Sequence, residues 1–155
     1  QAIRKSQYGE VMQRVADAEI EITYSRPVAR GRTLFGPDGI VSYGEEWNPG
    51  ADQATAIELS RDVTVNGQPL PAGVYSIWAI PGPDAWTMIF SHAGDVYHVP
   101  YPGEDRDALR LTIAPEQGDH METLAFYFPV VEGRDAVLRF HWGRVVVPLA
   151  IHVPG

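Results

Sequence analysis

The sequence predicts an all-β protein, an antiparallel β-sandwich or jelly-roll-like barrel of about nine or ten short strands. Fifteen glycines and thirteen prolines interrupt the 155 residues so often that little room is left for long helices. Between these residues, short segments alternate between apolar and polar side chains, which is the pattern of half-buried strands. Turn signals recur about every ten residues, a spacing typical of antiparallel sandwiches and barrels.

The first half of the chain contains the clearest strand signals. Residues 18–25 place apolar side chains at every even position and Glu, Thr or Ser at every odd one. The residues Thr55, Ile57 and Leu59 repeat this alternation, and residues 62–65 lead into Asn66-Gly67, the strongest two-residue hairpin signal. Residues 6–14 fit either a short helix or a leading strand.

The second half of the chain predicts further strands and most of the tryptophan core. Residues 74–80 and 86–91 flank a Pro-Gly-Pro-Asp turn and are expected to pair as a hairpin. Three tryptophans lie inside alternating segments and are therefore predicted to be core residues: Trp78, Trp86 and Trp142. The remaining predicted strands are 109–113, 123–131, 136–142 and 144–153.

Composition and charge limit the function classes. A length of 155 residues predicts a single domain, residues 1–155. The net charge of −8 argues against a nucleic-acid partner, because it repels phosphate backbones. No apolar run approaches the ~20 residues of a membrane span. Because the chain begins at Gln1 without Met, a removed signal peptide is one candidate, and a periplasmic or secreted location is expected.

The longest stretch without periodicity, residues 26–52, is expected to be a long ordered loop and the place where function lies. It carries Arg26, Arg30 and Arg32, and clustered guanidinium groups suit carboxylates or phosphates. The alternative is that these arginines pin the loop to the sandwich by pairing with carboxylates. The candidate partners for such pairs are Glu45, Glu46, Asp52 and Glu58.

The same loop contains aromatic side chains next to polar ones. Tyr43 and Trp47 beside Asp52 and Thr55 have the composition of a saccharide or small-ligand pocket. Alternatively, the two aromatic rings cap the core under the loop. The sequence therefore predicts a binding module for a small anionic or saccharide ligand, with these candidate binding residues: Arg30, Arg32, Tyr43, Trp47, Asp52 and Thr55.

Evidence for catalysis or a metal is weaker. The five histidines lack metal-ligand spacing, so neither a metal nor a cofactor is expected. If 136–142 is a regular strand, His141 points away from the core, toward solvent or a groove. The catalytic residues are unknown, although carboxylates near Asp52 and Glu58 leave a hydrolase as an alternative. A second alternative is an assembly domain that contacts another protein, such as a second copy in a homodimer.

A series of motifs runs in order along the chain: Tyr24-Ser25-Arg26-Pro27, residues 31–36, Tyr43-Gly44, Trp47, residues 50–55, residues 70–76, Ile80-Pro81 and residues 138–148. These motifs resemble a bacterial domain-of-unknown-function family, number 2911, from about Ser6 to Pro148. The resemblance implies a β-rich, often exported domain without an established activity, so the predicted binding module is expected to be exported. This sequence has Asn48 where the family usually has Arg, Asp52 where Asn is usual, and Gly143 where Glu commonly follows the tryptophan.

Overall fold

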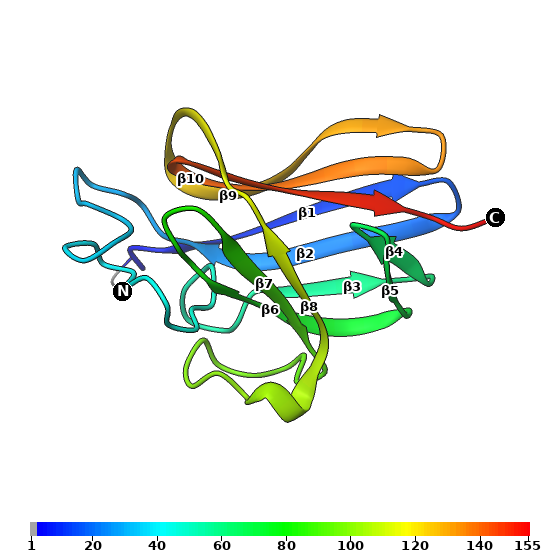
Figure 1. Cartoon of the computed structure of the whole chain (residues 1–155), viewed down its shortest axis with the longest axis horizontal. Coiled ribbons are helices and arrows are strands. Elements are labelled where there is room, and N and C mark those ends of the chain that lie inside the picture. The colour runs from blue at the N-terminus through cyan, green and yellow to red at the C-terminus, as the bar shows by residue number, and fades with distance from the viewer. Residues whose placement is uncertain (1–2) are drawn as a thin grey trace.

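A computed structural model describes residues 3–155 as two antiparallel sheets, with one short 3-10 helix, η1 (Glu104–Arg106) (Figure 1). The six-stranded sheet has the order β1-β2-β3-β6-β7-β8, and the four-stranded sheet has the order β5-β4-β10-β9. The predicted all-β sandwich is confirmed, and the sheets do not close into a barrel. The strands are β1 (Gln7–Val15), β2 (Ala18–Arg26), β3 (Ala56–Leu59), β4 (Val63–Val65), β5 (Gln68–Leu70), β6 (Gly73–Ile80), β7 (Trp86–Ser91), β8 (Asp107–Ile113), β9 (Glu116–Glu132) and β10 (Asp135–His152).

Of the two alternatives for residues 6–14, the structure contains the strand. β1 pairs with β2 from Gln7 opposite Arg26 to Val15 opposite Ala18, so only two residues connect the strands. Ala16 in this turn adopts a φ of 53°, as two-residue hairpin loops require. The even-numbered apolar residues of β2 are all buried, which confirms the face that their alternation predicts.

The two other predicted hairpins are present. Asn66 and Gly67 adopt φ values of 51° and 80° between β4 and β5, which is the backbone geometry that an Asn-Gly turn favours. The Asn66 side-chain oxygen also accepts a hydrogen bond from the Ala150 N–H at 2.8 Å, and this contact ties the hairpin to β10. β6 pairs with β7 from Ser76 opposite Ser91 to Ile80 opposite Thr87.

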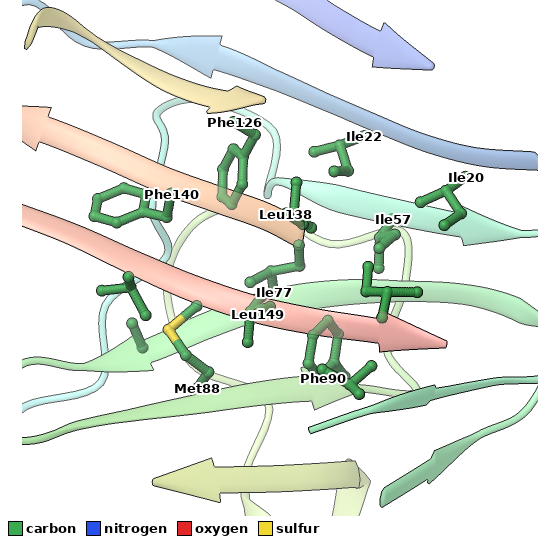
Figure 2. Close-up of a cluster of buried hydrophobic side chains, with 14 of the residues drawn as sticks. Ile20, Ile22, Ile57, Ile77, Met88, Phe90, Phe126, Leu138, Phe140 and Leu149 are labelled. Atoms are coloured by element: carbon green, nitrogen blue, oxygen red, sulfur yellow. The ribbon is translucent and has the colours of Figure 1, made fainter. Parts of the chain in front are cut away.

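The core lies between the two sheets and is made of inward-facing side chains from both (Figure 2). Trp86 and Trp142 belong to it, and Trp78 is equally buried but packs on the other face of the six-stranded sheet, with Ala54 and Ile89. The prediction that these three tryptophans are core residues is therefore confirmed. The labelled members in Figure 2 are Ile20, Ile22, Ile57, Ile77, Met88, Phe90, Phe126, Leu138, Phe140 and Leu149.

β10 folds back on itself. A straight strand of 18 residues would extend roughly 60 Å. The two ends of β10 instead lie side by side, because the Val153 N–H, just after the strand, donates to the Arg134 carbonyl, just before it, at 2.8 Å. The bend lies near Gly143, which has a φ of 58°, and the register with β9 shifts on both sides of it. A Cβ at this glycine would lie 2.8 Å from the Leu34 side chain. The predicted segments 136–142 and 144–153 are thus the two limbs of one bent strand.

The prediction that His141 faces solvent or a groove is wrong, because this side chain is only 7% exposed. β9 begins at Glu116, earlier than the predicted 123, and its first residues cover the imidazole. His141 Nε2 lies 2.8 Å from the Asp119 carbonyl, so this nitrogen carries the proton. Nδ1 then accepts a hydrogen bond from the Tyr127 hydroxyl, at 2.8 Å.

Candidate functional site

The segment between β2 and β3, residues 27–55, is the long loop that the sequence predicts. Although it contains no strand, four isolated bridges join it to the sandwich or close it on itself: Val28–Thr123, Phe35–Val41, Trp47–Ala79 and Gln53–Tyr97. The loop projects at one end of the sandwich, which is the end where the chain begins (Figure 1).

Aromatic side chains connect the loop to the core. The Trp47 ring stacks on Trp142 with centroids 6.0 Å apart and an interplanar angle of 12°. Phe35 makes edge contacts with Trp47 and Trp86, with centroids 5.6 and 5.0 Å apart. The Trp47 backbone also exchanges two hydrogen bonds of 2.7 Å with Ala79. The alternative that Trp47 caps the core is confirmed, because its ring extends the aromatic core into the loop.

Two of the loop's arginines pin the backbone, as the alternative interpretation predicts, but their partners are carbonyl oxygens instead of carboxylates. Arg32 donates from Nε to the Ala29 carbonyl at 2.9 Å and from Nη2 to the Val28 carbonyl at 2.6 Å. Arg26 donates from Nε to the Leu124 carbonyl at 2.8 Å. Neither guanidinium group forms a salt bridge within residues 3–155.

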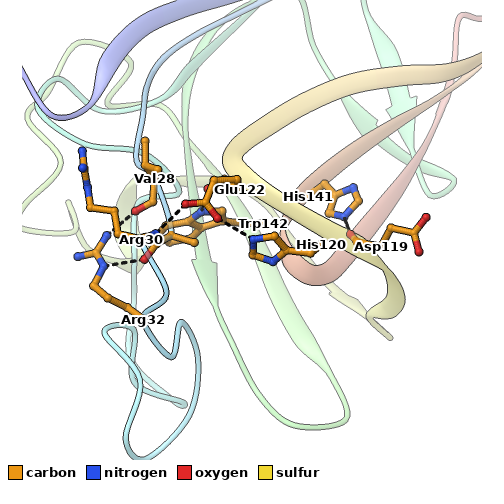
Figure 3. A network of polar contacts seen from close by, with 9 residues as sticks. Val28, Arg30, Arg32, Asp119, His120, Glu122, His141 and Trp142 are labelled. Atoms are coloured by element: carbon orange, nitrogen blue, oxygen red, sulfur yellow. Dashed lines mark hydrogen bonds and ion pairs between the residues drawn. The ribbon is translucent and has the colours of Figure 1, made fainter.

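Arg30 lies next to Glu122 of β9 in the network of Figure 3. The Arg30 backbone has a φ of 56°, and its N–H donates to Glu122 Oε2 at 2.9 Å. His120 Nε2 lies 2.7 Å from the other oxygen of this carboxylate. The hydrogen bond from His120, and then that from the Arg30 N–H, hold the pKa of Glu122 below its ordinary value. Glu122 therefore engages the Arg30 backbone and leaves the guanidinium group available.

Arg30 and Arg32 line a pocket of about 280 Å³, which we name the basic pocket. Three cationic side chains line it, from Lys5, Arg30 and Arg32, and no carboxylate does. The Arg30 Nη2 donates to the Lys5 carbonyl at 3.3 Å, which joins the N-terminal segment to the loop. The other lining residues are mainly apolar: Ser6, Pro27, Val28, Ile40, Val41, Trp47, Gly50 and Trp142.

Of the six predicted binding residues, the structure brings Arg30, Arg32 and Trp47 together in this pocket. Tyr43 does not line it; its ring lies over Gly36, where a Cβ would come within 3.3 Å of it. Asp52 lines a neighbouring groove and forms a 2.9 Å ion pair with Arg4.

Thr55 is fully buried, so its role here is structural. Its hydroxyl donates to the Pro49 carbonyl at 2.6 Å, and its N–H donates to the Asn48 side chain at 3.1 Å. The buried Asn48 amide in turn donates to the Ile77 carbonyl at 2.7 Å. Asn48, which departs from the family pattern, thus fixes the end of the loop against β6.

Sequence reasoning missed Lys5 and Trp142 as pocket residues. Lys5 precedes β1 and lies far from the loop in sequence, so no local pattern connects it to Arg30. The alternation around Trp142 predicts a core residue, and this is correct. Its indole N–H donates to the Glu122 carbonyl at 3.2 Å, and the residue also lines the pocket.

The carboxylates of the hydrolase alternative are not brought together. Asp52 borders the groove near Arg4, whereas Glu58 lies with Glu19 and Glu21 in a depression on the outer face of the six-stranded sheet. Across residues 3–155, no group of three or more His, Asp or Glu side chains is arranged to hold a metal ion. In the same residues, no helix has the length and apolarity that a membrane crossing requires.

Comparison with protein-family models gives one match. The family described as "Protein of unknown function (DUF2911)" matches residues 6–151. The chain belongs to the DUF2911 family. The predicted resemblance is thereby confirmed over nearly the whole chain. Comparisons with curated proteins and with solved structures gave no match. Because DUF2911 membership carries no activity, the function of this member has to be argued from its site.

Proposed function

We propose that this DUF2911 protein binds a small anionic ligand in the basic pocket. The observation that carries the proposal is the convergence of Lys5, Arg30 and Arg32 on one pocket that no carboxylate lines, in a chain with a net charge of −8. Three like charges repel one another, and the neighbouring carboxylate of Glu122, which does not line the pocket, is bound by His120 and the Arg30 N–H. An anionic ligand would remove that repulsion and gain charge-assisted hydrogen bonds.

The donors that remain on the arginines suit a carboxylate or phosphate. Arg30 uses only Nη2 among its side-chain donors, and Arg32 uses Nε and Nη2, in contacts with residues 3–155. Arg30 therefore keeps its Nε–H and its Nη1 group free within these residues, and each can donate a hydrogen bond to a carboxylate or phosphate oxygen. The ammonium group of Lys5 adds a compact charge without a fixed direction.

The remaining walls favour a ligand with an apolar face beside its charge. Val28, Ile40, Val41 and Trp47 provide apolar surface next to the cations. A volume of about 280 Å³ is at the small end of ligand pockets. A single sugar acid or a small organic acid fits both properties, because each combines one anionic group with a compact carbon skeleton.

The test is a calorimetric titration with galacturonate, inorganic phosphate and neutral galactose. We expect galacturonate to bind and galactose to bind much more weakly, and Arg30→Gln and Lys5→Gln to weaken galacturonate binding at least tenfold, since a hydrogen bond to a charged group contributes about 1.5–3 kcal/mol. Arg106→Gln is the matched control, because it removes the same charge from η1, outside the pocket. If no anion binds, or if Arg30→Gln and Arg106→Gln behave alike, the proposal is wrong.

A further inference from the structure

A second depression, which we name the N-terminal trough, lies beside the basic pocket. It has a volume of about 590 Å³, and its own lining includes Arg4, Gln7, Tyr8, Arg26 and Thr123. It shares Lys5, Val28 and Arg30 with the basic pocket. The two cavities are therefore adjacent and are separated only by side chains that face both.

Positive charge continues from the pocket into the trough. Five of the twelve Lys and Arg residues line one cavity or the other, and no carboxylate lines either within residues 3–155. Arg4 is engaged with Asp52 at 2.9 Å, whereas Arg26 donates to carbonyl oxygens, lies over the Tyr24 ring and forms no ion pair within residues 3–155. Each cavity thus offers charge of its own, and Lys5 and Arg30 lie where the two meet.

Each cavity also contains an aromatic ring and neutral hydrogen-bonding groups. Trp47 and Ser6 line the basic pocket, and Tyr8, Gln7 and Thr123 line the trough. Tyr8 is 66% exposed, and its hydroxyl donates to Glu10 Oε2 at 2.9 Å, so its ring faces are open to a ligand. Aromatic faces bind the C–H faces of sugar rings, while hydroxyl and amide groups bind sugar hydroxyls.

From this repetition we infer that the ligand is an acidic oligosaccharide, a chain of sugar acids with one residue in the basic pocket and the next in the N-terminal trough. The inference rests on the proposed function and extends it to a ligand class. The same three components, a cation, a ring and a neutral polar group, occur twice side by side. A ligand that repeats a carboxylate, a ring face and hydroxyl groups at every unit matches that arrangement.

A short oligonucleotide also repeats an anion and a ring, but it fits less well. Both ligands carry about one negative charge per unit, but the inner sugars of a DNA oligonucleotide have no free hydroxyl groups, whereas Ser6, Gln7 and Thr123 line the two cavities with groups that bind hydroxyls.

The experiment is a calorimetric titration with galacturonate, digalacturonate and tetragalacturonate, and with the tetranucleotide dT4 as the competing class. Occupation of two adjacent sites by one molecule raises affinity through effective concentration, so we expect at least tenfold tighter binding of the dimer than of the monomer. Tyr8→Ala should abolish this gain and leave monomer affinity unchanged. Met12→Ala, which changes an exposed residue of the same strand outside the trough, is the matched control and should change neither affinity.

The outcomes separate the two proposals. Equal affinities for the monomer, dimer and tetramer would overturn the oligosaccharide inference and leave the proposed function standing. A gain with chain length that survives Tyr8→Ala would overturn the role of the trough. Tighter binding of dT4 than of tetragalacturonate would assign the site to nucleic acid and overturn the inference. Absence of binding by every anion would overturn both proposals.

Discussion

The basic pocket and the depression on the outer face of the six-stranded sheet are similar in size but opposite in charge and construction. The outer depression has a volume of about 250 Å³ and is lined by Glu19, Glu21 and Glu58 together with Met12 and Val74. Its residues come mainly from β1, β2, β3 and β6, and Glu21 lies directly opposite Glu58. The basic pocket is built mainly from the 27–55 loop, the segment before β1 and Trp142.

The difference shows how construction determines what a depression can do. Side chains on one face of a sheet stand roughly parallel to one another, so the three glutamates are neighbours without a common centre. A loop that crosses the end of the sandwich can direct side chains from several segments into one space. The loop also brings Trp47 against the core, which gives the basic pocket a rigid apolar wall that the outer depression lacks.

The largest expected effect is at the wall that the basic pocket shares with the core. Trp142 is 1% exposed, so Trp142→Ala should lower the free energy of unfolding by about 3–5 kcal/mol. Met12→Ala at the edge of the outer depression should change it little, because this side chain is 55% exposed. Urea denaturation measures both. If the urea midpoint of Trp142→Ala were nearly that of wild type, Trp142 would not be a core residue that the pocket wall shares.

A smaller effect is expected from the guanidinium that pins the loop. Arg32→Ala removes two hydrogen bonds to carbonyl groups and should cost only about 1 kcal/mol of stability, because the residue is exposed. It should also weaken anion binding, because it removes one of the pocket's charges. Arg144→Ala removes an equal charge from an exposed side chain without a hydrogen bond in residues 3–155, and urea denaturation should show almost no change. Equal stabilities of the two variants would argue against the pinning role.

The contacts of Glu122 predict a pH dependence of stability. Its hydrogen bonds from His120 and the Arg30 N–H lower the pKa of the folded carboxyl group. A carboxyl group with a lowered folded pKa stabilises the protein above its unfolded pKa and loses that contribution as the pH falls through the folded pKa. Glu122→Gln should therefore be less stable than wild type at neutral pH, with a difference that shrinks in acid.

Thermal unfolding of the wild type and Glu122→Gln from pH 7 to about pH 2 tests this sign. Glu116→Gln, at the start of the same strand, is a control, because its side chain makes no hydrogen bond within residues 3–155. A difference between the wild type and Glu122→Gln that grows in acid would be the opposite of the expected sign.

The smallest effect is expected in the outer depression. Like charges directly opposite on neighbouring strands are destabilising, so Glu58→Gln should raise stability by a few tenths of a kcal/mol at low salt. The gain should disappear at high salt, where exposed charges are screened. Urea denaturation at two ionic strengths measures it, and a loss of stability at low salt would mean that Glu58 has a stabilising contact instead.

The outer face was predictable from sequence, and the basic pocket was predictable only in part. The alternation of residues 18–25 predicts which side of β2 is polar, because the side-chain period of a strand needs no tertiary information. The loop's boundaries and three of its pocket residues were also predictable. Lys5 was not, since it meets Arg30 only after the N-terminal segment crosses the loop.

Tertiary structure also explains the remaining differences. The burial of His141 depends on the fold-back of β10 at Gly143 and on the early start of β9, neither of which has a periodic signal. Thr55 and Asn48 are residue types that are common in loops, so the sequence does not single them out. Their structural role comes from hydrogen bonds that are buried in the folded protein.

A ¹H–¹⁵N NMR titration of the ¹⁵N-labelled protein with galacturonate tests most directly whether the basic pocket binds a small anion. We expect the chemical-shift changes to concentrate at the amides of Lys5, Arg30 and Arg32 and at the indole N–H of Trp47, while the amides of Glu21 and Glu58 stay unchanged. Shifts centred on the outer depression, or an unchanged spectrum at millimolar galacturonate, would contradict the assignment of the basic pocket as the binding site.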